Sequence, residues 1–161
     1  MFQTARCTNQ IVGPQYAPDI GYTASMSMPP YEEIEHTADL ALRVRGRDLA
    51  ELLRHAAEGM LDLSEAQPKP GETRSVHLDL HAPDDEQLLV MWLEELLYGM
   101  EMREVTYRDI EIQVLNGNRL VANMQELPLG SLAMHIKAVT FHDLRIIPTQ
   151  EGLEATIVFD I

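Results

Sequence analysis

The chain has 161 residues, of which 45% are hydrophobic but only 6% aromatic, and this suits a single domain with an aliphatic core. It contains no run of about 18 apolar residues and begins without an apolar leader, so we expect neither a membrane span nor a secretory signal. The formal net charge of −14, from 26 acidic and 12 basic residues, disfavours direct binding to the backbone of RNA or DNA and favours a cation or a basic protein partner.

Residues 1–30 differ in composition from the rest of the chain. They contain four prolines, show no sustained hydrophobic period, and carry only Arg6 and Asp19 as charged residues. We therefore expect a flexible extension over residues 1–30 and one domain over residues 31–161. The single cysteine, Cys7, lies in the extension, which excludes an internal disulfide and a cysteine-based zinc site and is consistent with the reducing cytoplasm.

The first regular elements follow residue 30. Leu40 to Arg45 alternates between apolar and polar residues, as a strand does, and Gly46 closes it. Leucine, alanine and methionine then recur every three to four residues, which predicts an amphipathic helix over residues 49–61. Asp48 is its expected N-cap, with Glu51 as the partner in a capping box.

A second strand and helix come next. Residues 67–73 contain two prolines and a glycine and predict a turn, after which residues 76–80 alternate as a strand. A helix is expected from Asp84 or Asp85 to about Met102, with its leucines, Trp92 and Met100 on the buried side.

The last third of the chain reads as strands. The alternating segments are residues 110–114, 120–124, 137–147 and 153–159. Asn116-Gly117 predicts a hairpin turn between the first two, Pro128 and Gly130 predict a loop, and residues 148–152 predict the last turn. Because two helices stand among about six or seven mainly antiparallel strands without regular alternation, the sequence predicts an α+β fold with the helices packed on the sheet.

The end of the chain concentrates negative charge. An alternating strand runs directly into the last residues, and its parity places Asp160 on the face opposite Phe159. The carboxylates of Asp160 and Ile161 repel each other unless a cation or a donor lies between them. With a third carboxylate such as Asp39, at a neighbouring strand end, they would form an oxygen site suited to Ca²⁺ or Mg²⁺; the alternative is a solvated strand end.

Several other polar residues are candidates for chemistry. Thr140 and His142 are expected on one strand face, where His142 would be a ligand or proton carrier, or simply a hydrogen-bonded histidine. Lys137 would be a nucleophile or phosphate contact, or a charge that protects a sheet edge. His36 and Thr37 are equally compatible with a turn or cap before the strand.

Three segments, in order along the chain, together resemble the archease family. Glu35-His36-Thr37-Ala38-Asp39 resembles its first signature, residues 137–142 (KAVTFH) resemble its second, and Phe159-Asp160-Ile161 resembles its usual C-terminus. The resemblance covers about residues 31–161. The second signature departs from its common form at Phe141, where the family commonly has tyrosine.

This resemblance implies a specific role. Archeases are non-catalytic partners of a GTP-dependent tRNA-splicing RNA ligase, and they promote guanylylation of its active-site histidine and multiple turnover. The family's divalent metal ion, usually described as calcium, corresponds here to Asp39, Asp160 and Ile161. The expected partner is therefore the ligase, contacted through protein rather than through RNA, with the acidic surface docking on a basic one.

Two other classes of function stay open at this point. A small metal-dependent hydrolase would use Asp39, Asp160 and His142. It would also need a substrate pocket, and no sequence motif predicts one. A chaperone-like binding module is suggested only by the acidic composition.

Overall fold

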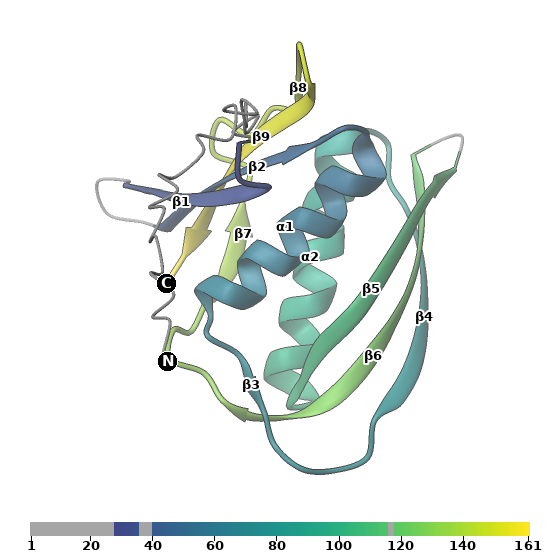
Figure 1. Cartoon of the computed structure of the whole chain (residues 1–161), viewed down its shortest axis with the longest axis vertical. Helices are drawn as coiled ribbons and strands as arrows, with labels where there is room; N and C mark the ends of the chain where they lie inside the picture. Colours follow the sequence, from purple (N-terminus) through teal and green to yellow (C-terminus); the bar gives the residue numbers. More distant parts are fainter. Residues whose placement is uncertain (1–27, 36–39, 116–117) are drawn as a thin grey trace, which may run out of the picture.

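The structure is a computed structural model that describes residues 28–35, 40–115 and 118–161. Within these residues the chain forms nine strands and two helices (Figure 1). The strands are β1 (Tyr31–Glu35), β2 (Leu40–Gly46), β3 (Gln67–Pro68), β4 (Arg74–His81), β5 (Val105–Leu115), β6 (Arg119–Ser131), β7 (Ala138–Thr140), β8 (Ile147–Thr149) and β9 (Gly152–Asp160). The helices are α1 (Leu49–Leu63) and α2 (Asp85–Met102).

The strands form two antiparallel sheets. The first has the order β1-β2-β9-β7, with β8 also paired to β9. In this sheet β2 and β9 pair along their whole length, from Gly46 opposite Leu153 to Leu40 opposite Phe159. In the second sheet β6 is central, with β5 along one edge and β4 and β3 along the other. The last strand of the chain is thus an interior strand of the first sheet.

The two helices lie between the sheets, so each sheet covers one side of the helical layer (Figure 1). Asp48 caps α1 by accepting from the Glu51 N–H at 2.8 Å, and Asp84 caps α2 by accepting from the Gln87 N–H at 2.7 Å. Glu51 completes the first cap differently from the expected capping box, because its carboxylate accepts from the Arg47 N–H at 2.7 Å. Trp92 joins the helices by donating its indole N–H to the Leu53 carbonyl at 3.0 Å.

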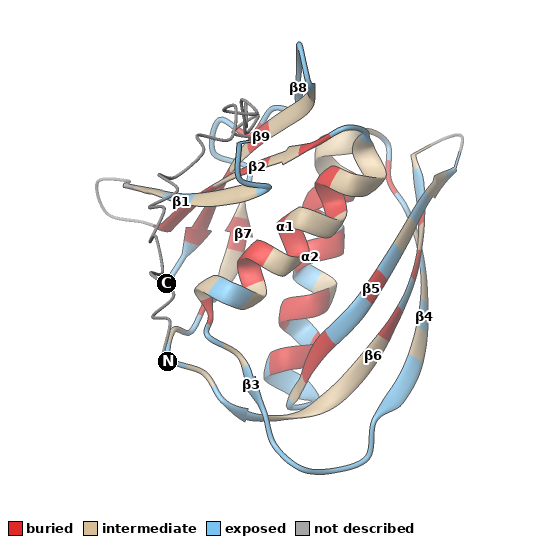
Figure 2. Cartoon of the chain, viewed as in Figure 1, coloured by how far each residue is buried: buried red, intermediate tan, exposed pale blue. Residues whose placement is uncertain are grey.

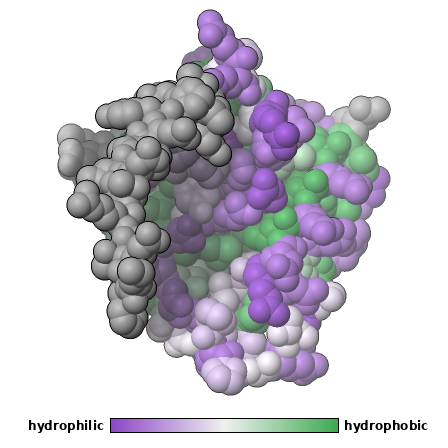
Figure 3. Space-filling view, viewed as in Figure 1, coloured by the Kyte–Doolittle hydropathy of each residue, from purple (hydrophilic) through white to green (hydrophobic). Residues whose placement is uncertain are grey.

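Burial follows this layering (Figure 2). The largest fully buried side chains include Trp92 from α2, Leu42 from β2 and Phe159 from β9. No buried side-chain nitrogen or oxygen among the described residues lacks a hydrogen-bond partner. Hydrophilic side chains are interspersed with hydrophobic ones over the face seen in Figure 3. No helix in the described ranges is long and apolar enough to cross a membrane.

The α+β class and both principal helices are confirmed, but several strand boundaries are wrong. Pro128 and Gly130 lie inside β6, where Pro128 pairs with Val105 and its carbonyl accepts from the Lys69 N–H at 2.9 Å. The expected strand over residues 137–147 is divided into β7 and β8. The charged segment Tyr31–Glu35 forms β1, and two residues of the predicted 67–73 turn form β3, so the strands outnumber the six or seven expected.

Candidate functional site

The carboxyl end of β9 lies between the ends of two neighbouring strands. Leu40, the first described residue of β2, is paired with Phe159 on one side. On the other side Ala138 of β7 is paired with Asp160, and the Lys137 N–H donates to the Asp160 carbonyl at 2.8 Å. Antiparallel pairing therefore brings Lys137 beside the last two residues of the chain, which lie at the end of β9 marked C in Figure 1.

The two carboxylates predicted for a metal lie at this tip. Asp160 is exposed although the preceding residue, Phe159, is fully buried, and Ile161 is 44% exposed. Lys137 is exposed as well, and its Nζ donates to the Ile161 oxygen at 3.0 Å. Of the predicted site residues, the structure thus brings together Lys137, Asp160 and Ile161.

His142 does not lie on a strand face beside Thr140, as expected, because β7 ends at Thr140. The chain turns over residues 142–143, where Asp143 has a φ of 48°, a left-handed conformation that interrupts extended structure. His142 is exposed in this turn, and its Nε2 lies 3.5 Å from the Asp143 carboxylate. Its N–H donates to the Thr140 hydroxyl at 3.4 Å, so the two residues stay in contact through the turn.

Three predicted site residues, His36, Thr37 and Asp39, lie outside the described residues. In the ranges that the structure does describe, no group of three or more His, Cys, Asp or Glu side chains is arranged to hold a metal ion. Asp160 and Ile161 lie within the described residues and Asp39 does not, and all three remain predicted ligands.

The chemistry of these donors suits a hard divalent cation. Carboxylate oxygens are the ligands that Ca²⁺ and Mg²⁺ prefer, and both groups are exposed at the strand end. The Asp160 carboxylate makes no hydrogen bond or ion pair with any other described residue. One positive charge, the Lys137 ammonium, lies beside the Ile161 oxygen.

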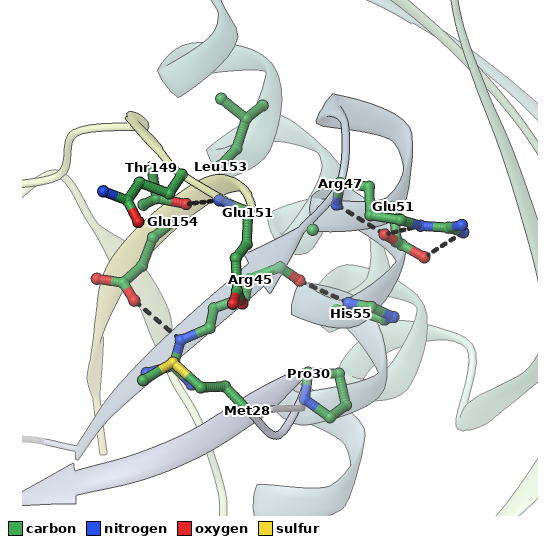
Figure 4. A pocket seen from close by; sticks show the side chains of 12 residues that line it. Met28, Pro30, Arg45, Arg47, Glu51, His55, Thr149, Glu151, Leu153 and Glu154 are labelled. Atoms are coloured by element: carbon green, nitrogen blue, oxygen red, sulfur yellow. Dashed lines mark hydrogen bonds and ion pairs between the residues drawn. The ribbon is translucent and has the colours of Figure 1, made fainter. Parts of the chain in front are cut away.

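A hollow lies at the opposite end of the β2–β9 pair, where Gly46 is paired with Leu153 (Figure 4). Its volume is about 640 Å³, and its lining includes Met28, Arg45, Arg47, Glu51 and Glu154. No sequence motif pointed to this hollow, because its lining comes from the ends of β2 and α1 and from the β8–β9 turn, which meet only in the fold.

The arginines in this hollow are already paired. Arg45 donates from Nε to Glu154 at 2.9 Å and from Nη2 to Glu32 at 2.7 Å, and the hydrogen bond to Glu32 is the main cause of its raised pKa. Arg47 holds Glu51 through its side chain and its N–H, and these hydrogen bonds lower the pKa of Glu51 to about 2. Both arginines in the hollow therefore already have carboxylate partners.

Comparison with known proteins identifies the family. Residues 31–161 match the sequence profile of the archease protein family. The chain belongs to the archease family. It is 33% identical over 139 residues to the protein archease of Methanosarcina barkeri, covering 81% of this chain and 95% of that protein. It is 32% identical over 135 residues to the protein archease of Archaeoglobus fulgidus, covering 81% and 98%.

Solved archease-like structures share the fold. A solution structure of a Methanobacterium thermoautotrophicum protein superimposes with a TM-score of 0.59 at 25% identity, over 83% of this chain and all 100% of that one. A crystal structure from Thermotoga maritima, described as an archease and possible chaperone, has a TM-score of 0.59 at 22% identity and covers 84% and 98%. The arrangement of helices and sheets in this archease is therefore that of its family.

Proposed function

We propose that this archease is a non-catalytic accessory protein that activates a GTP-dependent tRNA-splicing RNA ligase. It would promote guanylylation of the ligase and so allow multiple turnover, and it would act in the cytoplasm. Its membership of the family carries this proposal, together with the exposed carboxylates at the end of β9.

The proposed metal site consists of Asp39, Asp160 and Ile161, with calcium as the ion. When bound, the ion would supply a concentrated positive charge for phosphate oxygens at the partner's nucleotide site. Asp160 and Ile161 would bind it from the end of β9, which is paired with β2 and β7. His36, Thr37, Thr140 and His142 are proposed as contacts around the site, and Lys137 as the residue that holds the Ile161 oxygen.

The charge of the chain favours a protein partner over RNA. A net charge of −14 repels phosphate backbones and attracts a basic protein surface, so the expected contact is with the ligase itself. Salt should then weaken the association, because screening reduces attraction between exposed charges.

The test is guanylylation of the cognate ligase by GTP, with the ligase limiting and the full-length chain added. Wild-type protein should raise both the rate and the number of turnovers, whereas Asp39→Ala should abolish the stimulation while keeping the far-UV circular dichroism of the fold. Glu101→Ala is the matched control, since Glu101 is an exposed carboxylate near the end of α2. Full stimulation by Asp39→Ala would remove the carboxylate site from the proposal.

The chaperone-like alternative makes a separate prediction. It requires that the protein suppress aggregation of unrelated unfolded clients at similar concentrations, without preference for a ligase. Stimulation confined to the ligase, with no such suppression, would exclude it.

A further inference from the structure

Free edges of the two sheets include β1, β5 and the β7–β8 side of β9, and each carries features that discourage pairing with another strand. β1 holds Glu32, Glu33 and Glu35 within five residues. β7 and β8 have only three residues each. The register of β5 on β6 shifts between Arg108 and Glu111. Charge, short length and bulges all protect an exposed edge from further strands.

The strand β4 carries none of these features. It forms an outer edge of the second sheet (Figure 1), runs for eight residues from Arg74 to His81, and pairs with β6 in unbroken register. It contains no proline, glycine or lysine. In the described part of the chain β4 pairs with β6 alone. One row of its peptide groups is therefore open to another strand.

The β4 edge is also locally neutral in a chain of net charge −14. Apart from histidines, its charged residues are Arg74 and Asp79, which have opposite signs. Its outward side chains are held toward β6, because Asp79 accepts from Arg119 Nε at 2.8 Å and His77 Nδ1 lies 2.9 Å from the Asn123 side-chain oxygen. Two copies of the chain can therefore approach at β4 with less repulsion than at an acidic edge such as β1.

The sequence of β4 is complementary to itself. In an antiparallel pair about a two-fold axis at Leu78, His77 of each copy lies opposite Asp79 of the other. Val76 then lies opposite Leu80. An axis at His77 or at Asp79 would instead place identical polar groups opposite each other, which is less favourable. Val76, Leu78 and Leu80 are half-buried and pack on the core, so this pairing would cover apolar surface that they still expose.

We propose that the β4 edge binds a second copy of this chain, with the two β4 strands paired antiparallel about an axis at Leu78. The dimer joins the second sheets of the two copies into one continuous sheet. Two exposed strands of eight residues bury less than the area of about 1,200 Å² at which standard interfaces begin, so the dimer is weak and reversible. It requires neither the ligase nor a metal ion.

Sedimentation equilibrium of the full chain, from about 10 µM to about 1 mM in roughly 0.3 M salt, measures this association. The average mass should rise from 18.2 kDa toward twice that value. His77→Asp places a carboxylate opposite Asp79 of the second copy and should raise the dissociation constant about three- to tenfold. His77→Lys, at the same exposed site, creates an attractive pair and should lower the dissociation constant about two- to fivefold. A lysine that only blocked the edge would raise it instead.

Disulfide trapping tests the register. In a Cys7→Ser background, Leu78→Cys places two thiols opposite each other at the axis, within reach of a disulfide. Val76→Cys is the matched control on the same face of β4, because its two thiols would lie about 13 Å apart along the paired strands. Oxidised glutathione should link Leu78→Cys chains into dimers on a non-reducing gel, whereas Val76→Cys chains should stay single. Thermal unfolding followed by circular dichroism checks that each variant is folded.

A mass that rises with concentration, opposite shifts for the two His77 variants and trapping confined to Leu78→Cys support the dimer. A mass of 18.2 kDa over the whole concentration range overturns it. Equal trapping of both cysteine variants, or unchanged association of a folded His77→Asp, overturns it as well, since the copies would then meet through another surface.

Discussion

The two ends of the β2–β9 pair use charge in different ways. At the end where Gly46 lies opposite Leu153, Arg45 is held between Glu32 and Glu154, so the acidic and basic groups satisfy each other. At the end where Leu40 lies opposite Phe159, exposed carboxylate oxygens lie beside the ammonium group of Lys137.

This difference suggests different roles for the two ends, with paired charges stabilising the fold at one end and exposed carboxylates offered to a ligand at the other. Charged groups that already pair with each other are less available to a ligand, whereas neighbouring exposed carboxylates at a strand end repel each other unless a cation lies between them. The hollow of about 640 Å³ therefore lies at the end where the charged groups are paired, and the candidate site lies at the other end.

The largest effect is expected for the residue that anchors the acidic tip. Phe159 is fully buried, so Phe159→Ala should lower the free energy of unfolding by about 3–5 kcal/mol through lost burial and a residual cavity. Phe141→Ala is the control, because Phe141 is 57% exposed and its loss should cost less than about 1 kcal/mol. Urea denaturation measures both, and equal costs would mean that the tip of β9 is not packed as described.

At the end of the β2–β9 pair where Gly46 lies, a loss of stability is expected from overpacking. A Cβ on Gly46 would lie 2.3 Å from the Leu52 nitrogen and 2.7 Å from its Cα, and main-chain atoms at the start of α1 cannot move aside independently. Gly46→Ala should therefore destabilise by about 2–3 kcal/mol. Gly130→Ala is the milder comparison, since its closest contact would be 3.1 Å. A Gly46→Ala variant as stable as wild type would show that α1 is not held this tightly against β2.

Local signals in the sequence predicted much of this fold. Asp48 and Asp84 marked the starts of both helices because capping depends on residues only three apart. The loop predicted from Pro128 is wrong, because proline usually ends a strand but its carbonyl still accepts a hydrogen bond in β6. The charged strand β1 was missed because its place in the sheet is fixed by pairing with β2 and not by its own composition.

The candidate site was predicted only in part for a related reason. Adjacent carboxylates at Asp160 and Ile161 can be read from the sequence, but the contact from Lys137 joins residues 24 positions apart. Only the register of β7 on β9 determines it. His142 was misplaced because alternation continued past Thr140, whereas the left-handed Asp143 ends the strand geometry there.

A smaller effect of pH on the free energy of unfolding is expected from the Arg47–Glu51 pair, near the end of β2 at Gly46. The pKa of Glu51 is lowered to about 2 from 4.5 by hydrogen bonds from Arg47, so its stabilisation is present above pH 4.5 and is lost as the pH falls toward 2. Because Arg47 is 85% exposed, solvent screening limits the contribution to about 1 kcal/mol.

The measurement compares urea denaturation of wild type and Glu51→Gln at pH 7 and pH 2.5. Wild type should lose about 1 kcal/mol more than the variant on acidification, since the other carboxylates titrate in both proteins. An identical pH dependence would mean that the Arg47–Glu51 pair does not form in solution.

The smallest effect on the fold is expected for Asp160, directly beside the most sensitive position. In chelator, Asp160→Asn should change the free energy of unfolding by less than about 0.5 kcal/mol, because the side chain is exposed and makes no hydrogen bond or ion pair with another described residue. With calcium at about one hundred times its dissociation constant, wild type should gain about 2.7 kcal/mol and the variant nothing. Glu101→Gln should gain as much as wild type. If Asp160→Asn gained equally, the calcium that stabilises the protein would bind elsewhere, and the acidic tip would be only a solvated strand end.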